Sequence, residues 1–337
     1  MWQVCHLLAD HHYQFQPTPS ECIHMDNIIP IVIIPGPKAP KDINSFFCPL
    51  INECKLLAKG VCTYDGAHNE SFDLHVYPIS THRDMQAIKH CTNLKGSNAF
   101  WPCHTCLIQA IWDESKPHST YYIPLHQPWQ PGVDDCEWDL ETLPHCTQSE
   151  HNKLLWDIFQ WDTKEARNWM CQFWGVNGRT ELCEIPSMWL FASFPHEWMH
   201  LVLENHGKGL LQLWKGTYKD LDEGKQKYII NEAIWALIGS ETTLSSSTIP
   251  SSFIWHTLNI YTEQYLFTAE DYGHWFLYIA PFVLWNRFLM DKFYQHFMLF
   301  HQILKTMLKL SFTKEEVSML HEMVIKYVRE YEKYVHA

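Results

Sequence analysis

The spacing of apolar residues changes along the chain, from short β-type runs near the N-terminus to helical spacing near the C-terminus. Residues 28–35 (IIPIVIIP) form a β-branched run that stops at Pro-Gly-Pro, which predicts a buried strand. Residues 42–59 carry apolar side chains at helical spacing up to Gly60 and predict a helix. Residues 61–65 and 72–79 flank a polar turn and predict two strands.

Helical spacing dominates the rest of the chain. A short helix is predicted over 84–93, and an amphipathic stretch lies near 150–174 within a region rich in Pro and Trp. From residue 194 onward the pattern predicts helices over 196–214, 224–239, 270–309 in pieces, and 313–335. The order of elements indicates an α/β part followed by an α part.

The composition is that of a folded globular protein, with 46% hydrophobic and 19% charged residues among 337. No apolar run reaches the roughly 18 residues that a membrane-spanning helix needs, so no membrane partner is predicted. The net charge of −13 makes the chain repel phosphate. Charge therefore argues against a free-standing nucleic-acid binder unless basic residues cluster locally.

All 12 cysteines lie at or before Cys183, and the N-terminus carries no secretory signal. Free thiols or a metal site are therefore expected rather than disulfides. Cys103-His104-Thr105-Cys106 has the spacing of a zinc knuckle, which is half of a zinc site. A redox Cys-x-x-Cys pair and two unpaired core thiols are the alternative interpretations.

Four residues on the predicted helix 196–214 carry candidate chemistry. His196, His200 and Glu204 are four residues apart and are predicted to share one face. The two His side chains could complete a zinc site with the knuckle. His196 to His200 also match H-E-x-x-H, in which two His bind zinc and Glu197 activates a water molecule. A zinc metallopeptidase is therefore an alternative function, although with 22 histidines in the chain the bare motif is only modest evidence.

Several tracts in order resemble blocks of the CACTA (En/Spm-like) DNA transposases. They are IIPIVIIPGPKAPKDINSFFCPL (28–50), TYDG followed by FDLHVYPISTHRDMQA, KGSNAFWPCHTCLI, and SFPHEWMHLVLENHGKGLLQLWKG. The resemblance runs from about residue 28 to the end of the chain. It implies a cut-and-paste transposase that acts on DNA in the nucleus; self-association is left open.

The resemblance also implies a fold and a set of site residues. The fold is an RNase H-like α/β core in which three acidic residues bind two Mg²⁺ or Mn²⁺ ions, with an insertion that carries a structural Zn²⁺ site. Asp84 matches the second acid and Glu204 the third, with Glu197 as the competitor. The implied zinc ligands are Cys103, Cys106, His200 and His196, of which His200 is the better match and His196 the weaker.

The first catalytic acid of the family is expected to be missing. Only 27 residues precede the block at residue 28, and neither Asp10 nor Asp26 lies in an apolar strand. We therefore expect an N-terminally truncated, inactive protein with an incomplete RNase H-like core; a non-catalytic domesticated binding protein is a further alternative. The expected regions are 1–27 as a poorly determined segment, 28–100 as the partial core, 101–193 as the insertion with the knuckle, 194–216 as the helix with the third acid, and 217–337 as a helical C-terminal region.

Overall fold

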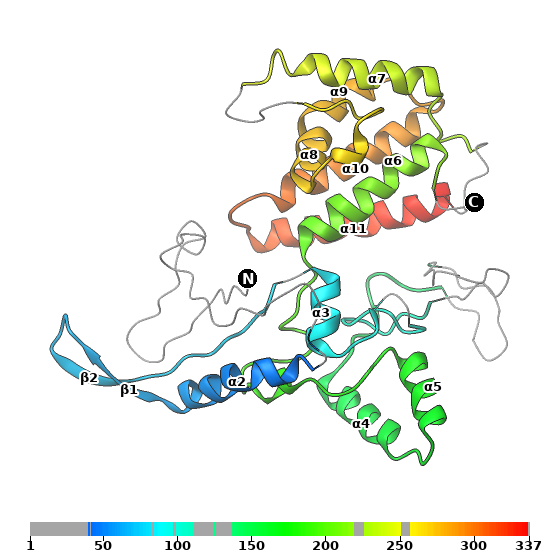
Figure 1. The fold of residues 1–337 in the computed structure, drawn as a ribbon. Coiled ribbons are helices and arrows are strands. Elements are labelled where there is room, and N and C mark those ends of the chain that lie inside the picture. The colour runs from blue at the N-terminus through cyan, green and yellow to red at the C-terminus, as the bar shows by residue number, and fades with distance from the viewer. Residues whose placement is uncertain are drawn as a thin grey trace. The chain divides into compact units, whose positions relative to one another are not determined.

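The structure, a computed structural model of the chain, describes residues 40, 42–82, 84–96, 99–110, 125, 137–218, 226–250 and 257–335. The predicted strand 28–35, Asp10 and Asp26 lie outside these residues. The chain divides into two compact units between Glu197 and Trp198, each with its own hydrophobic core. Figure 1 shows the elements of both units.

Unit 1 begins with the predicted helix, which is confirmed as α2 (Asn44–Lys59). It ends at Gly60, whose φ of 100° lies in the region that favours glycine. A Cβ atom at Gly60 would also stand 2.8 Å from the ring of His75. The positive φ therefore favours glycine here, and the His75 ring leaves little room for a Cβ atom.

The two predicted strands form an antiparallel hairpin, β1 (Val61–Asp65) and β2 (Glu70–Leu74). The prediction that the second strand runs over 72–79 is wrong at its end, since β2 stops at Leu74. Leu74 pairs with Val61, the first residue of β1, so β1 offers no partner beyond it. In the described residues the sheet has these two strands, and a larger RNase H-like sheet stays a prediction.

The rest of unit 1 is helical or irregular. Its helices are α3 (Met85–Thr92), α4 (Gln148–Phe159), α5 (Lys164–Trp174) and the 3₁₀ turn η3 (Glu181–Glu184). α3 confirms the short predicted helix, and the amphipathic stretch near 150–174 forms α4 and α5. One core cluster joins α2, α3 and η3, and the other joins α4 and α5 to Leu94 and Val176.

Unit 2 is entirely helical in its described residues. Its elements are η4 (Met199–Gly207, a π-helix), α6 (Lys208–Lys215), α7 (Glu232–Ser245), η5 (Gln264–Leu266), α8 (Ala269–His274), η6 (Trp275–Ile279, a π-helix), α9 (Ala280–Val283), α10 (Asp291–Met307) and α11 (Lys314–Val335). Among these helices and those of unit 1, none combines the length and apolar character needed to cross a membrane.

Two predicted helices begin later than expected. The helix predicted from residue 224 starts at Glu232, because Asn231 accepts a hydrogen bond from the N–H of Ala233 and so caps it. The helix predicted from residue 196 starts at Trp198, so His196 and Glu197 precede it. The predictions for α10 and α11 are confirmed, and their contact forms part of the core.

Tyr327 on α11 ties two histidines into the core of unit 2. Its hydroxyl lies 2.6 Å from Nε2 of His206, and its carbonyl oxygen lies 3.0 Å from Nε2 of His296. The ring of His296 also stacks on Tyr327 at 4.2 Å. Burial lowers the pKa of His206 to about 4 and also lowers that of His296. Both imidazoles are therefore neutral in the folded protein at neutral pH.

The folded protein is expected to lose stability as the pH falls from about 6.5 to 4. The unfolded chain binds a proton at His206 near its usual pKa of about 6.5, whereas the folded chain does so only near 4. Unfolding thus takes up a proton in this window, and acid favours it. From His206 alone we expect a loss of about 1–2 kcal/mol between pH 7 and pH 5, measured by urea unfolding. His206→Gln should flatten this slope, whereas His321→Gln, on the exposed face of α11, should leave it intact. An unchanged slope in His206→Gln would contradict this account.

Candidate functional site

The predicted knuckle is held in place by a short antiparallel pairing with residues far along the chain. Cys106 pairs with His145, and two hydrogen bonds flank the pair: Cys146 N–H to Thr105 O at 3.0 Å and Leu107 N–H to Pro144 O at 2.7 Å. This pairing brings Cys146 and the start of α4 beside the knuckle.

Inside the knuckle, Cys103 is the sulfur that receives hydrogen bonds. The backbone N–H groups of Thr105 and Cys106 point to its Sγ at 3.3 and 3.4 Å. The Cys106 thiol also donates to it, which lowers the pKa of Cys103 and raises that of Cys106. Donors of this kind favour a thiolate. These hydrogen bonds therefore make Cys103 the more acidic thiol of the pair.

Two histidines pack beside the Cys103 side chain. His196 hydrogen-bonds to Cys103 through its side chain, and its Nδ1 is buried without a hydrogen-bond partner. The ring of His104 lies 4.2 Å from that of His196, and His104 Nε2 lies 2.7 Å from the carbonyl oxygen of Phe194. Of the two histidines implied as ligands, the structure brings His196, the weaker match, to the knuckle. His200 lies in unit 2.

The chemistry of this group fits zinc, because thiolate and imidazole are its usual ligands. The Nδ1 atom of His196 is buried and has no hydrogen-bond partner, which is the state expected of an imidazole whose ligand is not bound. As the side chains stand, no three His, Cys, Asp or Glu residues in the described ranges are arranged to hold a metal ion. The donors are therefore gathered but bonded to one another.

Asp84 lies at the start of α3 rather than at the end of a strand. β2 ends at Leu74, and the described residues between Leu74 and Asp84 are not part of the sheet. Asp84 Oδ1 accepts a hydrogen bond of 2.7 Å from the N–H of Ala87, so the side chain caps the helix. Asp84 therefore does not closely follow a strand, because β2 loses its partner at Leu74.

Glu204 lies on the π-helix η4 in unit 2, with its carboxylate 3.7 Å from Nε2 of His200. A π-helix bonds residue i to i+5 and so turns more slowly than an α-helix. The predicted single face of His196, His200 and Glu204 is wrong for His196, which precedes the helix. The same start places Glu197 before the helix, so the H-E-x-x-H run does not form one helical face.

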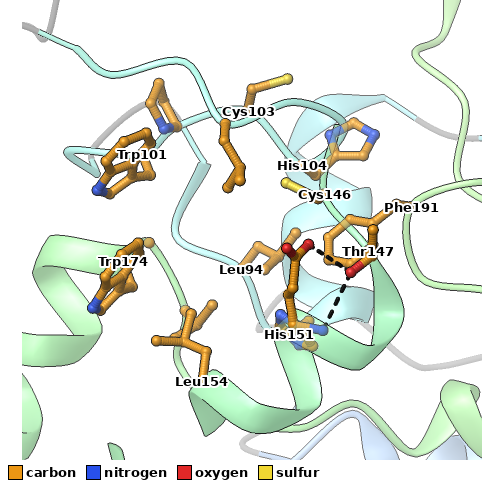
Figure 2. Close-up of a pocket in the computed structure, with 15 residues that line it drawn as sticks. Leu94, Trp101, Cys103, His104, Cys146, Thr147, His151, Leu154, Trp174 and Phe191 are labelled. Atoms are coloured by element: carbon orange, nitrogen blue, oxygen red, sulfur yellow. Dashed lines mark hydrogen bonds between the residues drawn. The ribbon is translucent and has the colours of Figure 1, made fainter. Parts of the chain in front are cut away.

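A cavity of about 260 Å³ opens beside the knuckle within unit 1. Trp101 and Trp174 lie together on one side of it, across from Leu94, Thr147 and His151 (Figure 2). Sequence reasoning singled out Cys103 and His104 but missed this cavity and the part that Trp101, Trp174 and His151 play in it. The signal was weak: one His in α4 and scattered aromatic residues, joined only by the pairing of Cys106 with His145.

Asp84→Ala is expected to lower the free energy of unfolding by about 1 kcal/mol, because the N–H of Ala87 loses its cap. Asp84→Asn should change it by only a few tenths of a kcal/mol, because Asn caps as well as Asp. Urea unfolding of both variants measures the difference. If Asn cost as much as Ala, the carboxylate would have a structural role beyond the cap.

Comparison with known proteins bears on the N-terminal part of the chain. No curated protein and no solved structure matches the chain. A family model matches residues 1–128, which include Asp84, Cys103 and Cys106 but not His196, His200 or Glu204. The matching model is that of the transposase family tnp2, and this match supports a transposase family for the protein.

Proposed function

We propose that the protein derives from a cut-and-paste DNA transposase of the CACTA type. The observation that carries this proposal is the match of residues 1–128 to the transposase family tnp2. The matched part holds one proposed acid, Asp84, and the Cys103–Cys106 knuckle. The partner is then DNA, and the site of action is the nucleus.

The proposed chemistry is phosphodiester cleavage and strand transfer with two divalent ions. One ion activates the attacking oxygen and the other stabilises the leaving oxygen, so each needs carboxylate ligands such as Asp84 and Glu204. Capping is compatible with this role, since Asp84 uses Oδ1 for the helix and a carboxylate has a second oxygen. The proposal includes an RNase H-like core around these acids.

Two acids are fewer than this chemistry needs. We assign Asp84 and Glu204 but no first acid, and two-metal catalysis depends on the full set of ligands. The chain as given is therefore proposed to be inactive in DNA cleavage. The function proposed for such a chain is then binding of DNA or metal rather than turnover.

Zinc is proposed as a structural ion at the knuckle. Cys103, Cys106 and His196 are the donors that unit 1 gathers, and the family resemblance adds His200 from unit 2. Zinc would tie α4 and the knuckle to the segment that leads into η4, and such sites contribute folding energy. The zinc metallopeptidase alternative is not favoured, because His196 and Glu197 precede the helix that should carry them.

Purified protein is expected to hold close to one zinc ion per chain, as a single site of four ligands implies. Cys103→Ser combined with Cys106→Ser should abolish it, and His196→Gln should weaken it, as measured by mass spectrometry of bound metal. The matched control is Cys48→Ser combined with Cys62→Ser, two exposed cysteines outside the knuckle. Full zinc content in the Cys103 and Cys106 variant would overturn the site.

The proposed shared acid site is tested by replacing Mg²⁺ with Fe²⁺ and adding ascorbate. The bound iron then generates radicals that cut the protein backbone near it. Cuts are expected near both Asp84 and Glu204, because the two acids are proposed to hold the same ions. Excess Mg²⁺ and Asp84→Asn should suppress both, whereas Asp157→Asn on α4 should suppress neither. The readout needs no turnover, which suits an inactive chain. Mg²⁺-sensitive cuts near only one acid would contradict a common site.

A further inference from the structure

The cavity beside the knuckle has a flat aromatic wall. The indoles of Trp101 and Trp174 stack with ring centroids 5.6 Å apart and planes 14° from parallel. Gly175 permits this arrangement: its φ is 71°, and a Cβ atom there would stand 2.4 Å from the carbonyl oxygen of Trp101. The end of α5 can thus lie directly against the segment that carries Trp101.

Apolar side chains complete the walls. They come from the α4 side and from the isolated Leu94–Val176 pairing: Leu94, Leu107, Leu154, Val176 and Phe191. The space of about 260 Å³ corresponds to roughly nine waters at ~30 Å³ each. That is room for one small ring system and not for a larger ligand.

Two buried polar atoms on this cavity have no hydrogen-bond partner. They are Nε2 of His151 and Nε1 of Trp101. His151 is only 6% exposed, and a buried polar atom without a partner is destabilising. A ring with a polar edge fits such a cavity, because its faces contact the apolar walls and its edge can bond to the two unpartnered polar atoms.

The charges around the cavity exclude an anionic ligand. Glu150 lines it and accepts a hydrogen bond from the Thr147 hydroxyl. Burial lowers the pKa of His151 to about 4, so its ring is neutral at physiological pH. No Lys or Arg is among the described residues that line the cavity. A neutral flat heterocycle fits, and a phosphate or carboxylate does not.

We propose that this cavity receives a single nucleobase turned out of a DNA strand. The base would stack on the Trp101–Trp174 wall and place its polar edge at His151 Nε2, while its phosphates stay outside. The choice of a nucleobase rests on the proposed function on DNA; the cavity itself specifies only a neutral heteroaromatic ring. Base stacking on aromatic side chains contributes about 1–3 kcal/mol per base.

The test compares a labelled single-stranded oligonucleotide with the same backbone made abasic, by fluorescence anisotropy on the full chain. The intact oligonucleotide should bind about 5- to 150-fold more tightly, the range that stacking of one base implies. Free thymidine and adenosine form a second arm, in which saturation-transfer NMR detects their contact with the protein.

Two variants test the cavity and one serves as the control. Leu154→Trp fills the space and should remove both the advantage of the intact strand and the nucleoside signal. His151→Phe keeps the ring against Phe191 but removes the polar edge, so it should weaken base binding while raising the unfolding temperature. Trp156→Ala, on the exposed face of the same helix, should leave base binding unchanged.

The outcomes separate this inference from the proposed function. Equal binding of intact and abasic strands, or an advantage that persists in Leu154→Trp, overturns the base site and leaves DNA binding standing. In another outcome, free nucleosides bind the wild-type chain and lose their signal in Leu154→Trp while neither strand binds. That result would overturn a DNA strand as the source of the base, and the DNA function with it. Weaker base binding in a more stable His151→Phe protein excludes misfolding as the cause and supports the site.

Discussion

The pairing of Cys106 with His145 is the contact on which the candidate site depends. It is short, with one residue pair and two flanking hydrogen bonds, yet it sets the knuckle against the start of α4. Thr147, which follows at once, caps α4 and so fixes the direction in which that helix leaves. His151 then falls one turn into α4 and faces the cavity. The register of one pair thus positions both thiols and the buried imidazole.

A second constraint acts at the other end of the cavity. Gly175 ends α5 with a positive φ and has no Cβ, so the chain can return against the segment that carries Trp101. Asn93 plays the same part for α3, with φ of 57°, and its carbonyl accepts the N–H of Asn177. Two left-handed residues, far apart in sequence, therefore hold the aromatic wall and the apolar floor together.

Local features of the fold could be predicted from sequence, and long-range ones could not. α2, α3 and α11 follow from apolar spacing and from their caps, which are properties of a few neighbouring residues. β2 ends where its partner strand begins, at the pair of Leu74 with Val61. η4 starts only after His196, because His196 packs in unit 1. His196 contacts Cys103, and these residues lie so far apart in the chain that the spacing of apolar residues cannot predict the contact. For that reason the site residues were predicted by type, while their grouping was only partly anticipated.

The charge balance sets how such a protein would meet DNA. A chain with net charge −13 gains no long-range attraction for a phosphate backbone. Short-range contacts then matter more, and in unit 1 the stacked indoles of Trp101 and Trp174 offer one such surface. Stacking does not depend on counterion release, so it is less weakened by salt than phosphate contacts are. Stacking of one base in a cavity that no described Lys or Arg lines is consistent with this charge balance.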